Sequence, residues 1–139
     1  MTKPIVRGSI RIDNAKAMRL ADDKIRLGLI TAGETARQLL DQELRQPGKG
    51  ELRPGGMSRA SRPGDPPAPD TGALRRSLAT ELSRKADGLV MEVSANKEYA
   101  APLEFGTEKM KPRPFMSLLL GKYRTAIRLA FERGAKRGR

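Results

Sequence analysis

Few side chains in this sequence could do chemistry, and the two most versatile ones are missing. The chain of 139 residues contains no histidine and no cysteine, which removes imidazole acid–base chemistry, thiolate nucleophiles, disulfides and the commonest zinc ligands. Two carboxylate pairs remain: Glu104 with Glu108, and the adjacent Asp22 and Asp23. Paired carboxylates without a metal or phosphate motif are weak grounds for catalysis. We therefore predict a protein that is not an enzyme and holds no metal or cofactor.

Positive charge is the chain's strongest chemical feature. Lysine and arginine outnumber acids by 28 to 16, a net charge of +12 that should attract polyanions or an acidic protein face. Seven basic residues near the end stand against the single acid Glu132, and they are Lys122, Arg124, Arg128, Arg133, Lys136, Arg137 and Arg139. This run is either a solvated helix face with a frayed end, or a surface that meets an acidic ring or DNA. No motif that reads the major groove accompanies it, so any DNA contact should be weak and salt-sensitive.

Aromatic residues gather late in the chain, in and after the stretch 99–116. Three of the five lie inside this stretch, so we expect the core to nucleate there. Tyr99 and Leu103 are one helical turn apart, while Pro102 limits that helix to a short piece. Gly106 can adopt the left-handed conformation that ends it. Glu104 and Thr107 then lie at the helix exit, and Pro112 and Pro114 hold an extended path that leads to Phe115.

Glu104 and two arginines are the polar residues with alternative roles. A half-buried carboxylate needs compensation, so Glu104 either accepts hydrogen bonds from local amides, pairs with Arg113 or Arg75, or forms a salt bridge across a subunit boundary. Arg75 and Arg76 are adjacent and in a strand would point to opposite faces. One could then pair inward while the other faces solvent or a partner.

Two long amphipathic helices are expected to position these groups. Asp13 can cap the first, whose apolar positions recur at three- and four-residue steps and end near Gln46; they are Ala15, Met18, Ile25, Leu29, Ala32, Ala36, Leu39 and Leu40. We expect Gly28 and Gly33 to bend or loosen this helix. The second should begin at Phe115 and end near Gly134, and a basic tail should follow over residues 134–139.

The strands are expected between the two helices. Leu78, Thr80 and Leu82 alternate as in a strand, although Leu74, Leu78 and Leu82 also fit helix spacing. Residues 89–94 form a better strand, and Ala86-Asp87-Gly88 before it is a hairpin signal. Asp70 or Thr71 can cap a short turn ahead of the pair, and residues 1–12 are an extended lead-in. The fold class is then α+β in a single domain over residues 1–139, with two long helices packed on a small antiparallel sheet.

Residues 46–72 differ in composition from the rest of the chain. Twelve of these 27 residues are glycine or proline, and few are apolar. We expect a long flexible loop, which is either a disordered surface segment or an arm that orders against a neighbouring subunit or a polyanion. No apolar run is long enough to span a bilayer and the start lacks a signal-peptide pattern, so we expect a cytosolic site of synthesis and no membrane contact.

Five motifs in order carry a resemblance to a known family. They are Gly64-Asp65-Pro66-Pro67, residues 70–78 with Thr71, Gly72, Leu74 and Arg75, Tyr99-Ala100, residues 103–107 with Glu104, Phe105, Gly106 and Thr107, and Pro114-Phe115. With these motifs the chain resembles the tail-component family of long-tailed bacteriophages, which are small neck and tail-completion proteins that join head to tail. The resemblance covers roughly residues 62–127.

That resemblance implies a function by binding alone. It implies a structural virion protein in the phage neck or tail, assembled in the host cytoplasm as a homo-oligomeric, sixfold ring at the head-to-tail junction or tail top. It also implies neighbouring partners: a stopper or adaptor, a tail terminator and the tail tube. The basic end of the chain adds the alternative of weak contact with DNA in the channel. The alternative from another class is a nonspecific nucleic-acid-binding protein of a phage or mobile element, which the net charge of +12 favours.

Overall fold

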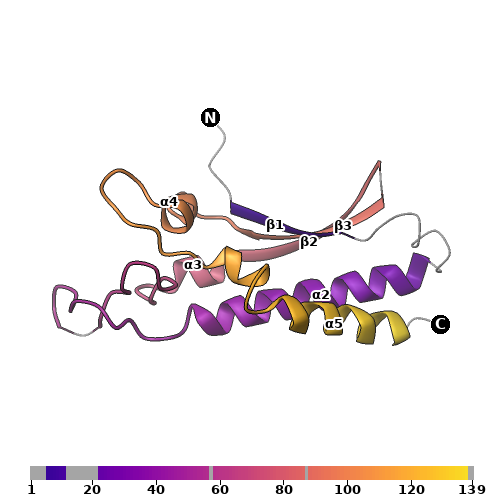
Figure 1. Cartoon of the computed structure of the whole chain (residues 1–139), viewed down its shortest axis with the longest axis horizontal. Coiled ribbons are helices and arrows are strands. Elements are labelled where there is room, and N and C mark those ends of the chain that lie inside the picture. Colours follow the sequence, from indigo (N-terminus) through magenta and orange to yellow (C-terminus); the bar gives the residue numbers. More distant parts are fainter. Residues whose placement is uncertain (1–5, 12–21, 57, 87, 138–139) are drawn as a thin grey trace.

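The protein has two layers, a small sheet packed on a pair of helices (Figure 1). This computed structural model describes residues 6–11, 22–56, 58–86 and 88–137. Within these ranges the sheet has three antiparallel strands, and two of the four helices are long. The predicted α+β class is confirmed. None of the described helices is long and apolar enough to cross a bilayer.

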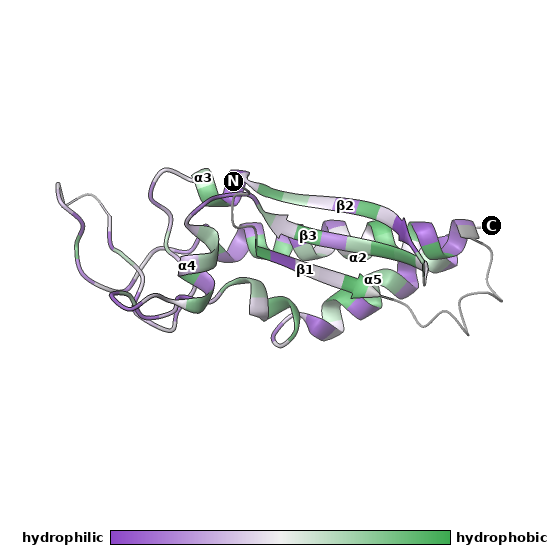
Figure 2. Ribbon diagram, turned by 90° about the horizontal axis from the view of Figure 1, so that it is seen from above, coloured by the Kyte–Doolittle hydropathy of each residue, from purple (hydrophilic) through white to green (hydrophobic). Residues whose placement is uncertain are grey.

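The sheet places its last strand in the middle. Strands β1 (Val6–Arg11), β2 (Leu78–Lys85) and β3 (Gly88–Ala95) lie in the order β1-β3-β2, which Figure 2 shows from above with the helices behind. Lys85 pairs with Gly88, so the predicted hairpin is confirmed, and Leu78–Leu82 is strand rather than helix. The sequence indicated only an extended lead-in for residues 1–12. In the structure, β1 is an edge strand of the sheet in which Val6 pairs with Ala95.

The first long helix, α2 (Asp22–Glu43), covers one face of the sheet. Five predicted stripe positions are no more than 5% exposed, namely Ile25, Leu29, Ala32, Ala36 and Leu40. The predicted cap Asp13 and the first two stripe positions, Ala15 and Met18, lie outside the described residues. The helix ends three residues before the predicted Gln46.

The second long helix, α5 (Arg124–Arg137), runs antiparallel to α2 and beside it (Figure 1). The predicted start at Phe115 is wrong, because a short 3-10 helix η1 (Met116–Leu119) and a turn come first. Gly121 lies in that turn, where its low helix propensity favours the interruption. The predicted end near Gly134 is also wrong. Gly134 is buried inside α5, and the first residues assigned to a basic tail form its last turn.

The glycines of α2 allow close packing and do not loosen the helix, which is continuous. A Cβ atom added at Gly28 would lie 2.5 Å from Cε2 of Phe131 in α5, and one at Gly33 would lie 2.6 Å from Cγ of Met91 in β3. Gly134 matches them from the other helix, since its Cβ would lie 2.6 Å from the carbonyl oxygen of Leu27. Both glycines of α2 thus allow close packing within a helix that stays continuous.

Two short helices flank the β2–β3 hairpin at one end of the molecule. Helix α3 (Ala73–Arg76) precedes β2 and helix α4 (Ala100–Phe105) follows β3. Pro102 is the third residue of α4, within the first turn that proline tolerates. Gly106 ends α4 with a positive φ of 77°, a region that strongly favours glycine, but its ψ of 175° differs from the predicted left-handed helical conformation.

The stretch 99–116 is only in part the packing centre that its aromatics suggested. Phe115 is fully buried, and Met116 beside it is 6% exposed. Tyr99 and Phe105 are instead 44% and 73% exposed. The core forms mainly between the sheet and α2, and its largest cluster includes Phe115. Two of the three rings that should have nucleated the core thus lie on the surface.

Residues 46–72 contain no named helix or strand among those described, but they bond to one another. The N–H of Gly50 donates to the carbonyl of Ala60 at 2.8 Å, and Leu52 forms an isolated β-bridge with Arg59. Arg53 donates to the carbonyl of Pro69 at 2.5 Å. The segment projects beyond the end of α2 in Figure 1.

Candidate assembly interface

The motifs that carry the family resemblance lie at one end of the molecule. Helices α3 and α4 and residues 61–72 border an open cleft of about 470 Å³ at that end. Its lining includes Asp70, Thr71, Leu74, Tyr99, Leu103 and Arg113. These positions are up to 43 residues apart in the sequence (from Asp70 to Arg113), yet they border one cavity. We define this region as the motif end.

Glu104 connects α4 to η1 through three hydrogen bonds. Its Oε2 atom accepts the backbone N–H groups of Phe115 at 2.7 Å and Met116 at 2.9 Å, and its Oε1 atom accepts that of Ser117 at 3.0 Å. These donors belong to the start of η1, where a helix has no internal partners for its first N–H groups. Glu104 is 8% exposed. Of the alternatives considered for Glu104, this chain adopts hydrogen bonds to backbone amides, not a bond to Arg113 or Arg75.

The segment between α4 and η1 folds back onto its surroundings. The N–H of Arg113 donates to the carbonyl of Leu103 at 2.6 Å, and the N–H of Gly64 donates to the carbonyl of Pro112 at 2.8 Å. Exposed Thr107 shapes the turn, because its hydroxyl accepts the N–H of Met110 at 3.1 Å. Half-buried Pro114 then leads to buried Phe115. Residues 103–115 therefore form a closed loop. Its two ends are joined by the bond between Arg113 and Leu103 and by the bond between Phe115 and Glu104.

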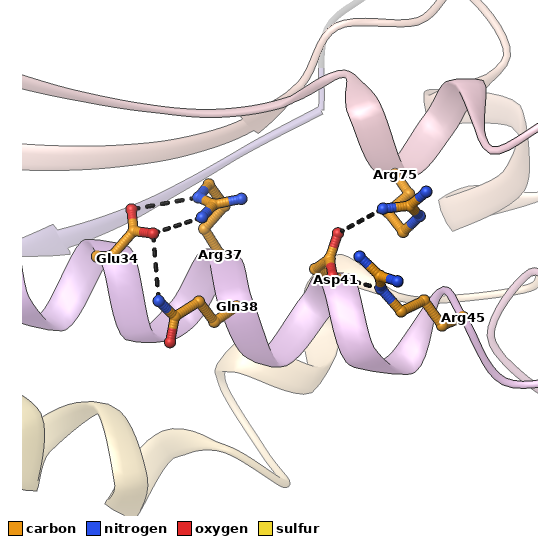
Figure 3. Close-up of polar contacts among 6 residues, drawn as sticks. All are labelled: Glu34, Arg37, Gln38, Asp41, Arg45 and Arg75. Atoms are coloured by element: carbon orange, nitrogen blue, oxygen red, sulfur yellow. Dashed lines mark hydrogen bonds and ion pairs between the residues drawn. The ribbon is translucent and has the colours of Figure 1, made fainter.

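Arg75 anchors α3 to α2. Its Nη1 donates to Oδ1 of Asp41 at 3.2 Å, and Asp41 also accepts from Arg45 at 2.7 Å (Figure 3). Partial burial opposes ionisation of Asp41, but the hydrogen bonds from Arg45 and Arg75 outweigh it and lower the pKa of its carboxyl. About two turns earlier in α2, the hydrogen bond from Arg37 lowers the pKa of Glu34 (Figure 3). Arg75 thus belongs to an intramolecular ion pair.

Arg75 and Arg76 lie in α3 and not in the strand considered for them, yet Arg75 still pairs inward with Asp41. Arg76 is exposed and donates to the carbonyl of Thr71 at 3.0 Å. The hydroxyl of exposed Thr71 accepts the N–H of Ala73 at 3.3 Å, which supports the predicted turn. Gly72 has φ of 77°, and its lack of a side chain leaves room for Nη1 of Arg76, 2.8 Å from where a Cβ would stand. The glycine is therefore required by the start of α3.

A second ionic cluster joins the ends of the two long helices. Glu43 of α2 accepts hydrogen bonds from both Lys122 and the hydroxyl of Tyr123. Partial burial opposes ionisation of Glu43, but these two donors outweigh it and lower the pKa of its carboxyl. Burial and the bond to Glu43 raise the pKa of the Tyr123 phenol. Lys122, predicted as a polyanion contact, is thus also a structural ion-pair donor.

The other basic positions mostly lie on the outside of α5. Arg124, Arg128, Arg133, Lys136 and Arg137 are exposed. Arg139 lies outside the described residues. None of these described basic residues lies in the cleft of the motif end. Arg124 and Arg128 instead share a second groove with Glu104 and Phe105.

Sequence reasoning missed Asp41 and Glu43 as partners. Asp41 meets Arg75 across 34 residues, and Glu43 meets Tyr123 across 80. Both acids lie on α2 outside its apolar stripe, and nothing local distinguishes them from other charged helix residues. Within the described ranges, no three acidic side chains gather closely enough to hold a metal ion.

Comparison with protein-family models, with curated proteins and with solved structures finds no match for this chain.

Proposed function

We propose that this chain is a non-enzymatic structural protein of a phage virion, which forms a ring at the head-to-tail junction or the tail top. One observation carries the proposal: residues from four of the five motifs of the family resemblance, among them Pro67, Thr71 and Leu103, border a single cleft at the motif end. Motifs that served only the internal fold would have no reason to share one open surface. Their convergence supports a common role in binding a neighbour.

Ring closure would use a contact between two different surfaces of adjacent copies. Such a heterologous contact generates a closed ring when its rotation closes. Tyr99, 44% exposed beside the cleft, is the kind of aromatic residue that anchors interfaces. Residues 46–72 and the chain's basic end would order against neighbouring copies or against the stopper, terminator and tube proteins. The ring would be sixfold, as the resemblance implies, and would lie in the virion.

Native mass spectrometry and light scattering of the purified protein test this proposal. We expect a closed oligomer, or a monomer that assembles when a neighbouring neck or tail-tube protein is added. Tyr99→Ser should impair assembly without unfolding the chain. Leu129→Ser is a matched control, because Leu129 is 45% exposed but lies on α5 away from the cleft. A chain that stays monomeric and binds no neck or tail protein contradicts the proposal.

A second candidate function rests on the exposed cations of α5. Five basic side chains accompany the single acid Glu132 on this helix, which suits nonspecific contact with a polyanion. Under the first proposal, DNA binding is weak near 0.15 M salt and falls steeply as salt rises. Tight binding at that salt concentration, abolished by Arg133→Glu with Arg137→Glu, would favour the nucleic-acid function instead.

A further inference from the structure

Strand β1 is an edge strand with an open groove beside it. It pairs with β3 on one side, and no described strand lies on its other side. An edge strand offers unpaired N–H and C=O groups to an added strand. The groove, about 600 Å³, is lined by Val6 through Ile10 and by side chains of η1 and α5, among them Met116 and Ile127. We call it the β1 groove.

Gly8 keeps this groove open. A Cβ atom there would meet only Cγ and Sδ of Met116 at 3.7 Å and Cδ1 of Leu119 at 3.9 Å, which are ordinary contacts. A larger side chain at position 8 would therefore extend into space that the glycine leaves empty.

The groove also carries the chain's most exposed apolar side chains. Phe105 is 73% exposed and Leu120 is 74% exposed, more than any other large hydrophobic residue described. Both line the β1 groove although they come from α4 and from the turn after η1. Two such residues beside one edge strand form an apolar surface that a partner would cover.

The charge of the groove selects the chemistry of that partner. Arg7, Arg124 and Arg128 line it, and Arg124 and Arg128 are one turn apart on α5. No described carboxylate forms an ion pair with either of these two arginines. The only acid in the lining is Glu104, which is already bonded to three backbone amides. The groove thus complements an acidic segment.

We propose that the β1 groove binds an extended, acidic segment of a partner protein as a fourth strand of the sheet. Backbone hydrogen bonds to β1 supply affinity, and alternate apolar side chains of the segment sit between Phe105 and Leu120. Acidic side chains of the segment pair with Arg124 and Arg128. The proposal does not depend on ring formation, because the motif-end cleft and the β1 groove are different surfaces.

The test uses capped fluorescent peptides of about nine residues, a typical strand length. The acidic peptide has valine at alternate positions with aspartate, glutamate and threonine between. One twin carries lysine in place of the acids, and another keeps the charge but has two central prolines, which cannot donate to a ladder. We expect the acidic peptide to bind the full chain at least about tenfold more tightly than either twin. Amide hydrogen exchange should slow in β1 on binding.

Two sets of variants locate the binding. Arg124→Glu with Arg128→Glu should lower the affinity for the acidic peptide by about tenfold or more and should raise the affinity for the lysine peptide. Arg133→Glu with Arg137→Glu makes the same charge change on α5 outside the groove and should alter binding less than about threefold. Gly8→Leu should block all binding by filling the groove. The arginine variants lie at exposed positions and keep the test valid if Gly8→Leu fails to fold.

Several results would overturn the proposal. It fails if the acidic peptide does not bind at millimolar concentration, or if all three peptides bind equally. It also fails if the two arginine pairs behave alike, since the effect would then be general electrostatics. Protection of β1 amides that grows with protein concentration alone would assign the groove to a second copy instead.

Discussion

Glu104 and Phe115 are bonded side chain to backbone across 11 residues, with 2.7 Å between the carboxylate oxygen and the amide nitrogen. The bond closes the loop that leads from α4 to η1 and fixes the position of the one fully buried phenylalanine. A carboxylate is suited to this place because it is an acceptor only, and three N–H groups point at it.

Replacing Glu104 should therefore destabilise the fold. Glu104→Ala leaves three donors without their acceptor, and we expect it to lower the free energy of unfolding by about 3 kcal/mol or more. Glu104→Gln keeps the shape but directs an NH₂ group at N–H donors, with an expected loss of about 2 kcal/mol. Urea denaturation measures both. Glu108→Gln, at an exposed position, is the control and should change the value by less than about 0.5 kcal/mol. Equal stability of all three variants would contradict the structural role of Glu104.

Acid should destabilise the protein through its paired carboxylates. The pKa values of Glu34, Asp41 and Glu43 are lowered in the folded chain. A lowered folded pKa gives stability that is present above the unfolded value, 3.8 for Asp41, and is lost as pH falls through the folded value. The free energy of unfolding should thus stay level between about pH 7 and 5 and fall below about pH 4.

The Asp41 contribution can be isolated with variants. Asp41→Asn should make the free energy of unfolding fall less steeply with pH below about pH 4. Arg75→Gln should reduce that slope in part. The double variant should behave like Asp41→Asn alone, because Arg75 acts on this acid. Denaturation at a series of pH values measures the slopes. An unchanged slope in Asp41→Asn would show that the Arg75 and Arg45 contacts do not hold in solution.

The seam between the long helices should tolerate no added methyl group. Gly134→Ala raises helix propensity, but its Cβ would lie 2.6 Å from the backbone oxygen of Leu27, which cannot move independently. We expect a net loss of about 2 kcal/mol. Gly33→Ala should lower the free energy of unfolding by less, since the flexible Met91 side chain can move away from the added methyl group. Gly121→Ala, with its nearest neighbour 3.9 Å away, is the neutral control. A stabilised Gly134→Ala variant would mean that the helices lie further apart.

Gly106 should be more sensitive than another glycine of similar backbone conformation. Gly106 has φ of 77° and Gly64 has φ of 89°, so alanine strains both. A Cβ at Gly106 would also lie 2.8 Å from Cδ of Pro112, whereas nothing lies within 4 Å at Gly64. We expect Gly106→Ala to cost about 3 kcal/mol and Gly64→Ala about 1 kcal/mol by thermal or urea unfolding. Equal losses of stability in the two variants would show that backbone strain alone destabilises them and that the contact with Pro112 adds nothing.

Local patterns predicted the elements that depend on nearby residues. The apolar stripe of α2, the turn before β3 and the positive φ of Gly106 each follow from a few consecutive side chains. The pattern could not show that Gly134 continues a helix, because its close neighbour Leu27 lies on the other helix. From the sequence, Gly134 was interpreted as a helix end and Gly28 as a weak point of a helix. In the structure both allow the two long helices to approach closely.

The candidate site was harder to predict, for a physical reason. Nothing adjacent to Asp41 or Glu43 indicates a partner 34 or 80 residues away. Tyr99 and Phe105 were assigned to the core because their rings are large, yet burial depends on which surfaces meet. The family motifs include many residues that border the cleft, and they also include Glu104 and Phe105 of the β1 groove. The groove itself depends on the position of residues 6–11 beside α5, which no motif marks.

The central place of β3 has a consequence for how the chain folds as it leaves the ribosome. Strand β1 is synthesised before its only described partner, β3, which is completed at Ala95. β1 therefore cannot pair until most of the residues up to Ala95 have been synthesised. The β2–β3 hairpin closes locally and should form early, while the pairing of β1 closes a loop of more than 70 residues and should be slow. During that delay β3 also has an open edge. The order of synthesis therefore makes the last addition to the sheet the step most exposed to aggregation.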